Sequence, residues 1–174
     1  QTIRSWALSQ SNQPVVIVPP HSEFIGNLVV TPDGSQVVRG LKSQQIGFFQ
    51  IESGELARVS EPLSTPIVPI ALDESGQTLA CLRGSGILDV LNVVDFSVLG
   101  TKTGLSETSC VAFFPGRPWL AIGSGNDIIV WDYESEEEVT KWEAHEFAVG
   151  NLRFSGDGER LYSSSISGAY GVQI

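Results

Sequence analysis

The sequence is poor in the residues on which many catalytic and metal sites depend. Its 174 residues include two cysteines, two histidines and no methionine. Cys81 and Cys110 form no CxxC pair and have no cluster of histidines nearby, so neither a disulfide framework nor a zinc site is predicted. We therefore expect two free thiols in buried strands, with no metal and no cofactor.

Basic residues are also scarce. Ten Lys and Arg stand against twenty Asp and Glu, which gives a formal net charge of -10. A nucleic acid or an anionic membrane surface would repel such a chain, so we expect neither as a partner. No apolar run approaches the roughly 20 residues that span a bilayer, the longest being short segments such as residues 15–18.

The first residues carry none of the features of a secretion signal. The chain opens on Gln1-Thr2-Ile3, without an initiator Met, a charged segment or an apolar segment. We expect that it starts inside a longer protein. Two unpaired cysteines favour a reducing compartment, which predicts a cytoplasmic location, or a nuclear one if the source is eukaryotic.

Motifs for nucleotide binding and catalysis are missing. The sequence contains no GxxxxGK[ST] and no GxGxxG, and the glycine-rich segments 84–86 and 123–125 join strands, with no helix N-terminus to hold an anion. The acidic segment 134–138 lacks the spacing of a calcium loop and is interpreted as a solvated turn. Its alternative role is to capture a Lys- and Arg-rich partner segment, with an affinity that falls as salt rises. No enzymatic activity is predicted.

The chain does contain an internal repeat. Four turn motifs are each followed by two residues of a short apolar run, and taking positions 34, 76, 117 and 158 as equivalent gives spacings of 42, 41 and 41 residues. The motifs are Pro32-Asp33-Gly34, Glu74-Ser75-Gly76, Pro115-Gly116-Arg117 and Gly156-Asp157-Gly158.

A second marker keeps the same period. Large apolar residues close β-rich segments at Trp6, Phe49, Leu91 and Trp131, which lie 28, 27, 26 and 27 residues before the next turn. The sequence between the markers is typical of β-strands and contains no helical pattern. Four short strands in about 40 residues predict an all-β fold, a β-propeller of four-stranded antiparallel blades with about four repeats of 41–42 residues.

The repeat sets the expected boundaries. Residues 1–25 are the third and outer strands at the end of one blade; residues 26–67, 68–108 and 109–148 are three blades; and residues 149–174 start a further blade. All belong to one propeller domain or part of one, since a single small sheet cannot cover both of its faces and must stack on its neighbours. Trp119 and Trp142 are assigned to packing between blades.

Residues 128–132, Ile-Ile-Val-Trp-Asp, resemble the ending that gives WD repeats their name. His145 lies 13 residues before Gly158, and His21 lies 13 residues before Gly34, as does the histidine of the WD-repeat family in the loop before the inner strand. The resemblance covers essentially the whole chain. The repeats are degenerate, because the matching loop positions of the middle repeats carry Leu63 and Gly104.

The resemblance implies a structural role for the residues at the family's histidine, aspartate and tryptophan positions. In that family a histidine, a hydroxyl residue of the second strand, an Asp and the Trp form a buried hydrogen-bonded group, which places His145, Trp131, Asp132 and His21 at structural positions. Family members close a ring of about seven or eight blades. We therefore expect further blades, or self-association, to complete the ring and cover its open strand edges.

The function implied is a non-catalytic scaffold that presents loops at the blade ends to a protein or peptide partner within a larger assembly. The alternative is a sensor or regulatory propeller fused to an effector or enzyme domain outside this chain. The loops before the inner strands, and those between second and third strands, hold the predicted contacts: Glu23, Phe24, Gln44, Ser64, Thr65, Glu107, Glu146 and Phe147.

Overall fold

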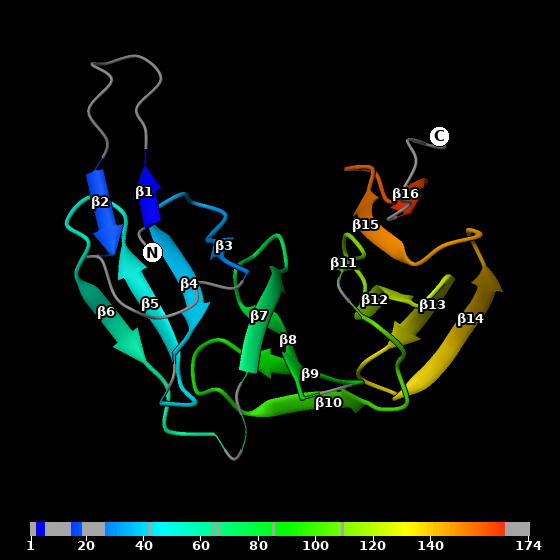
Figure 1. The fold of residues 1–174 in the computed structure, drawn as a ribbon, viewed down its shortest axis with the longest axis horizontal. Coiled ribbons are helices and arrows are strands. Elements are labelled where there is room, and N and C mark those ends of the chain that lie inside the picture. The colour runs from blue at the N-terminus through cyan, green and yellow to red at the C-terminus, as the bar shows by residue number, and fades with distance from the viewer. Residues whose placement is uncertain are drawn as a thin grey trace. The chain divides into compact units, whose positions relative to one another are not determined.

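A computed structural model describes residues 3–5, 15–18, 27–41, 43–63, 65, 67–84, 86–108 and 110–165 (Figure 1). Every regular element in these segments is a β-strand. No helix in this part of the chain is long and apolar enough to cross a membrane. The chain divides into two compact units, residues 1–69 and 70–174.

The first unit contains a two-stranded and a four-stranded antiparallel sheet. In the first sheet β1 (Ile3–Ser5) pairs with β2 (Val15–Val18). The second has the order β3 (Val29–Val30), β4 (Gln36–Gly40), β5 (Ile46–Gln50) and β6 (Leu56–Val59). Its two central strands bury Val38, Ile46 and Phe48 almost completely, and its outer strand is largely exposed.

Two further four-stranded sheets and one strand pair follow. The first consists of β7 (Ile67–Leu72), which contains the boundary between the units, with β8 (Thr78–Arg83), β9 (Ile87–Asn92) and β10 (Val98–Lys102). The second consists of β11 (Val111–Phe113), β12 (Trp119–Ser124), β13 (Asp127–Asp132) and β14 (Glu137–Glu143). The pair is β15 (Val149–Phe154) with β16 (Leu161–Ser165).

The sequence repeat is a structural repeat. The two apolar markers face each other across neighbouring strands in each complete sheet, as Val37 with Phe49, Leu79 with Leu91 and Leu120 with Trp131. The four turns also agree: the backbone N–H at positions 34, 76, 117 and 158 donates to the carbonyl three residues earlier, at 2.8, 3.1, 3.5 and 2.9 Å. The all-β class and the four-stranded repeat are confirmed.

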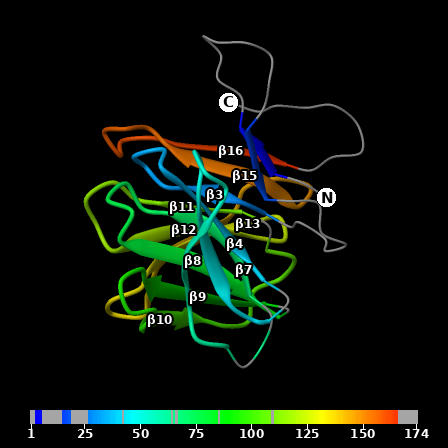
Figure 2. The same cartoon turned by 90° about the vertical axis from the view of Figure 1, so that its left-hand side faces the viewer.

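Apolar side chains hold the sheets of the second unit together. One cluster joins the β7–β10 sheet to the β11–β14 sheet through Leu88, Val90, Leu120 and Trp131. A second joins the β11–β14 sheet to the β15–β16 pair, and Figures 1 and 2 show these sheets lying side by side in that order. Because burial of apolar area is the main favourable contribution to folding, these layers stabilise one another.

The outer strand carries a bulge in each complete sheet. The pairing register of the third and fourth strands shifts between Phe48 and Phe49, between Val98 and Gly100, and between Val130 and Trp131. A bulge increases the local twist and blunts a sheet edge against pairing with other chains. All seven residues of β14 are exposed, including Trp142, so the predicted packing of Trp142 between blades is wrong.

A partly buried ion pair links three strands of the β7–β10 sheet. The Arg83 guanidinium donates to both carboxylate oxygens of Asp89 at 2.7 and 3.1 Å, and the Thr101 hydroxyl donates to Asp89 at 2.8 Å. Cys81 pairs directly opposite Asp89. Burial, and next the Asp89 charge, raise the pKa of the Cys81 thiol. Cys110 was also expected in a buried strand, but it is half-buried and precedes β11.

Aspartates in the turns have lowered pKa values, so we expect the stability of the chain to fall in acid. Hydrogen bonds from Thr31 and then Ser35 lower the pKa of Asp33 from 3.8 to about 2, and bonds from Ser97 and Ser155 lower the pKa values of Asp95 and Asp157. A lowered folded-state pKa contributes stability above the unfolded-state value, and that contribution is lost as pH falls through the folded-state value.

We therefore expect the free energy of unfolding to decline between about pH 4 and pH 2. Urea unfolding followed at several pH values across this range checks it. In Asp33→Asn the decline should be shallower, because that site no longer titrates. A decline of equal steepness in the variant would show that Asp33 does not contribute.

Candidate functional site

Strand direction sorts the connections of the second unit onto two ends. Because the strands alternate in direction, residues 84, 86, 103–108, 125–126 and 144–148 emerge at one end, which we call the loop face. Residues 73–77, 93–97, 114–118, 133–136 and 155–160 emerge at the other end, the turn face. The predicted partner contacts of this unit, Glu107, Glu146 and Phe147, all lie on the loop face.

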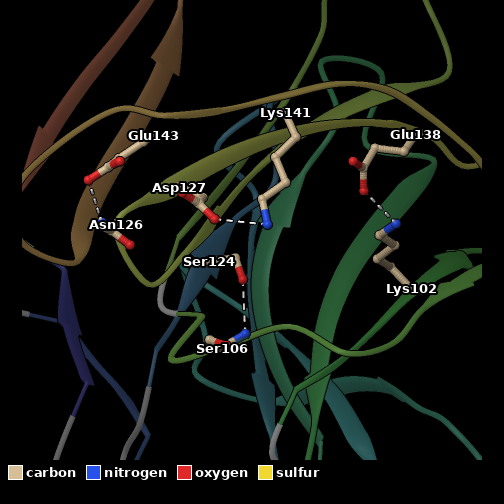
Figure 3. A network of polar contacts seen from close by, with 8 residues as sticks. All are labelled: Lys102, Ser106, Ser124, Asn126, Asp127, Glu138, Lys141 and Glu143. Atoms are coloured by element: carbon tan, nitrogen blue, oxygen red, sulfur yellow. Dashed lines mark hydrogen bonds and ion pairs between the residues drawn. The ribbon is translucent and has the colours of Figure 1, made fainter.

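Backbone hydrogen bonds tie the segments of the loop face together. The Ser106 N–H donates to the Ser124 hydroxyl at 2.9 Å (Figure 3), and the Gly125 N–H donates to the Ser106 carbonyl at 2.7 Å. The N–H groups of Ala144 and His145 both donate to the Asn126 carbonyl, at 3.0 and 3.2 Å. A binding surface held in this way loses little conformational entropy when a partner docks.

The loop face presents an apolar ring among carboxylates. Phe147 is 49% exposed, and Glu107 and Glu146 are exposed as well. Figure 3 shows Asn126 donating to Glu143 at 3.1 Å and Lys141 paired with Asp127 at 2.8 Å. Since Lys141 already has a carboxylate partner, its charge does not offset the exposed glutamates of the loop face.

The remaining predicted contacts fall in the first unit or outside the described segments. Gln44 lies in the β4–β5 connection with a φ of 61°, and its carbonyl accepts a hydrogen bond from the Leu63 N–H at 2.8 Å. The Thr65 hydroxyl is buried and has no hydrogen-bond partner among the described residues. Glu23, Phe24 and Ser64, together with His21, lie outside the described residues.

His145 makes a hydrogen bond within its own repeat. Its Nε2 lies 2.8 Å from the Ser163 hydroxyl on β16, the second strand of that repeat. The positions at which the family would supply the Asp and the Trp of this blade follow residue 165 and are outside the described residues. Among the described residues no carboxylate contacts the other ring nitrogen, as the third member of a catalytic triad would.

Trp131 does not make the hydrogen bond that the family resemblance implies. Its side chain is fully buried, yet its indole N–H has no hydrogen-bond partner among the described residues. In the repeat that contains Trp131, the positions equivalent to His145 and Ser163 lie 41 residues earlier. They hold Gly104 and Ile122, whose side chains cannot accept a hydrogen bond. Trp131 therefore contributes to this sheet by packing.

Asp132 organises the turn that follows β13. It accepts hydrogen bonds from the Trp119 indole at 3.1 Å and from the backbone N–H groups of Glu134 and Ser135 at 3.0 and 3.2 Å. Desolvation raises the pKa of Asp132, but the hydrogen bonds from Ser135, Glu134 and Trp119 outweigh it, and the net effect is a lowered pKa. Asp132 thus acts as an ionised structural residue.

No group of three or more His, Cys, Asp or Glu side chains in the described part of the chain could bind a metal ion.

The sequence did not reveal Ser163 as the partner of His145. The signal that could have identified it is its place in the second strand, 18 residues after His145, which a comparison with the family pattern would use.

The fold defines a class of protein: twisted four-stranded antiparallel sheets, repeated every 41–42 residues and stacked through apolar layers, are the blades of a β-propeller. The family described as WD domain, G-beta repeat matches residues 96–132, which run from the turn before β10 to the end of β13.

Known proteins agree with this assignment. The chain is 24% identical over 169 residues to human WD repeat-containing protein 90, a match that covers 96% of the chain and 10% of that protein. The solved WD40 repeats of RRP9 share 26% identity, with a TM-score of 0.65 over 78% of the chain and 43% of theirs. A chain of the mitotic checkpoint complex has a TM-score of 0.71 at 17% identity, over 91% of the chain and 51% of its own.

The family model, the relatives and the solved propellers together support a place for the chain among the WD-repeat β-propellers. It spans about a tenth of the length of human and mouse WD repeat-containing protein 90, which it matches over 96% of its own length. Propellers of this family generally serve as non-catalytic platforms for protein interactions.

Proposed function

We propose that the chain is a non-catalytic scaffold whose loop face binds a protein or peptide partner within a larger assembly. The observation that carries this proposal is Phe147, a large apolar side chain left 49% exposed on a connection whose backbone is held by hydrogen bonds. Aromatic side chains on rigid supports are frequent anchors of protein interfaces.

The charges around Phe147 suggest the character of the partner. Glu107, Glu143 and Glu146 are exposed and acidic, and the chain carries a net charge of -10. A partner that places an apolar pocket on Phe147 and basic residues around it would match this surface. The charges would raise the association rate, and binding would weaken as salt is added.

The wider setting belongs to the same proposal. The relatives matched over most of this chain are far longer than the chain, which is consistent with a scaffold that works as one part of a larger polypeptide or assembly. We place it in the cytoplasm, or in the nucleus of a eukaryotic source, because two free cysteines suit a reducing compartment.

The substitution Phe147→Ser tests the proposal. The wild-type chain and the variant are each immobilised and exposed to a lysate of the source organism, and retained proteins are quantified by mass spectrometry. Loss of an anchoring aromatic costs an interface about 2 kcal/mol or more, so at least one protein retained by the wild type should bind roughly thirtyfold more weakly.

Val94→Ser is the matched control. Val94 is 75% exposed, but it lies on the turn face, so its substitution removes an even more accessible apolar side chain from the other end of the strands. Retention should match that of the wild type. If both variants keep every protein that the wild type retains, Phe147 is no anchor and the proposal fails.

A further inference from the structure

The turn face contains a hollow that none of the predicted contacts line. Its volume is about 360 Å³, and it lies where the β7–β8 turn meets the β11–β12 and β13–β14 turns. Its walls are apolar or aromatic at Phe113, Phe114, Pro115 and Tyr133. Pockets of this volume with apolar walls and a few polar groups are typical of sites that bind one small group specifically.

Two carboxylates line this hollow without partners. Glu74 and Glu134 are exposed, and neither side chain makes an ion pair or hydrogen bond in the described part of the chain. Asp73, in contrast, uses its two carboxylate oxygens on its own turn, accepting from the Ser75 hydroxyl at 2.6 Å and the Thr78 N–H at 2.8 Å. The two glutamates therefore remain available to a ligand.

The one basic residue of the lining does not neutralise them. The Arg117 guanidinium lies over the ring of Trp119, 4.6 Å from its centroid, and 5.7 Å from that of Phe114. It thus stacks on aromatic side chains instead of pairing with Glu74 or Glu134. Two free carboxylates beside one stacked cation leave the hollow with a net negative charge.

The walls suit the stem of a long basic side chain. Phe113 and Tyr133 pack edge to face with ring centroids 6.2 Å apart, which fixes one wall, and Tyr133 is only 9% exposed. The methylene groups of arginine or lysine pack well on such surfaces while the charged end remains at the rim. A planar guanidinium can in addition stack on an aromatic face and donate to two carboxylates, which an ammonium group does less well.

We propose that this hollow binds an arginine side chain from an extended segment of a partner protein. Glu74 and Glu134 accept hydrogen bonds from the guanidinium, and Phe113 and Tyr133 contact the methylene stem. A second hollow of about 640 Å³ shares Glu74, Phe113 and Pro115 with the first, and apolar residues of β11 and β15 line it. The segment therefore continues from the arginine into an apolar residue.

This site goes beyond the proposed loop-face function and does not depend on it. The strands separate the two ends of the unit, so Phe147 does not contribute to the hollow. A partner could use either face alone. The two proposals are accordingly tested with different probes and different variants.

The test uses the full chain and the peptide acetyl-Gly-Arg-Leu-Gly-amide, followed by NMR or by the fluorescence of the tryptophans. The matched probe replaces arginine with citrulline, which keeps the shape and removes the charge. We expect the arginine peptide to bind at least about tenfold more tightly than the citrulline peptide, and binding to weaken as salt rises. The lysine peptide should fall between the two.

Variants assign the binding to the hollow. Glu74→Gln combined with Glu134→Gln should reduce the affinity for the arginine peptide at least about tenfold. Glu159→Gln is the control, because Glu159 is an exposed carboxylate of the turn face outside both hollows. That control and Phe147→Ser should both bind as the wild type does.

Three outcomes would overturn the proposal. The first is that the arginine peptide shows no binding at several millimolar, and the second is that the citrulline peptide binds equally well. The third is that acetyl-Gly-Glu-Leu-Gly-amide binds more tightly, which would show that Arg117 makes the hollow an anion site. Both glutamates are exposed, so unchanged urea unfolding of the double variant confirms that a lost affinity is not a lost fold.

Discussion

Replacing Trp131 with alanine lowers the free energy of unfolding by about 3–5 kcal/mol, the usual cost of truncating a buried tryptophan. Trp131 is fully buried in the layer between the β7–β10 and β11–β14 sheets, where it packs with Leu120 and Tyr133. Trp131→Phe, in contrast, costs only about 1–2 kcal/mol, because it removes fewer buried atoms and leaves a smaller cavity. The indole N–H has no partner to lose, so the phenyl ring gives up contact area alone.

Urea unfolding of the three proteins measures both effects. Trp142→Ala is the control, since Trp142 is 41% exposed on the outer strand, and its truncation should cost about 0.5 kcal/mol or less. If Trp131→Phe destabilised the chain as much as Trp131→Ala, the indole N–H would have a partner in solution. The explanation based on Gly104 and Ile122 would then be wrong.

Replacing Asp89 with alanine is expected to cost about 3 kcal/mol of unfolding free energy, because it leaves the Arg83 charge without its partner. The Asp89 side chain is 5% exposed and that of Arg83 is 29% exposed, so water partly rehydrates the stranded guanidinium and the loss falls at the low end of the usual range. The Thr101 hydroxyl also loses its acceptor.

Asp127→Ala provides the comparison for a pair near the surface. Asp127 accepts from Lys141 at 2.8 Å, as Figure 3 shows, but the side chains are 26% and 48% exposed. Breaking such a pair costs about 1 kcal/mol or less. Equal losses for Asp89→Ala and Asp127→Ala in urea unfolding would mean that the Arg83–Asp89 pair is solvated in the folded chain.

The strands and their period could be predicted from the sequence because both depend on local chemistry. A turn such as Pro32-Asp33-Gly34 needs a residue that tolerates a positive φ, and Gly34 has a φ of 71°. In the motif Pro115-Gly116-Arg117 the residue with a positive φ is Gly116, one position earlier than in the first motif. The residues of this turn therefore differ from those of the first turn, although its place in the repeat is the same.

The contacts between strands and sheets could be predicted less well. Nothing local to Trp131 reveals that its acceptor is missing, since the deciding residue, Ile122, lies on the neighbouring strand. Likewise, the sequence of β14 predicts a strand that contains Trp142, but it does not reveal whether another sheet covers the face on which Trp142 lies. Its exposure depends on how the layers stack.

The candidate sites show the same division. Glu107, Glu146 and Phe147 could be placed on one end because loops between alternating strands emerge predictably. The hollow on the turn face was not predicted, since its lining comes from three turns that the sequence separates, at residues 73–75, 113–118 and 133–134. Only the stacking of two repeats brings Glu74 and Glu134 to the same hollow.

Amide hydrogen exchange can show whether the loop face of the second unit binds a protein partner. Exchange is compared for the full chain alone and in complex with a protein that the wild type retains and Phe147→Ser does not. We expect slower exchange at residues 103–108 and 144–148 in the complex, where backbone and side chains form the contact. Unchanged exchange in both segments, with protection elsewhere in the chain, would contradict it.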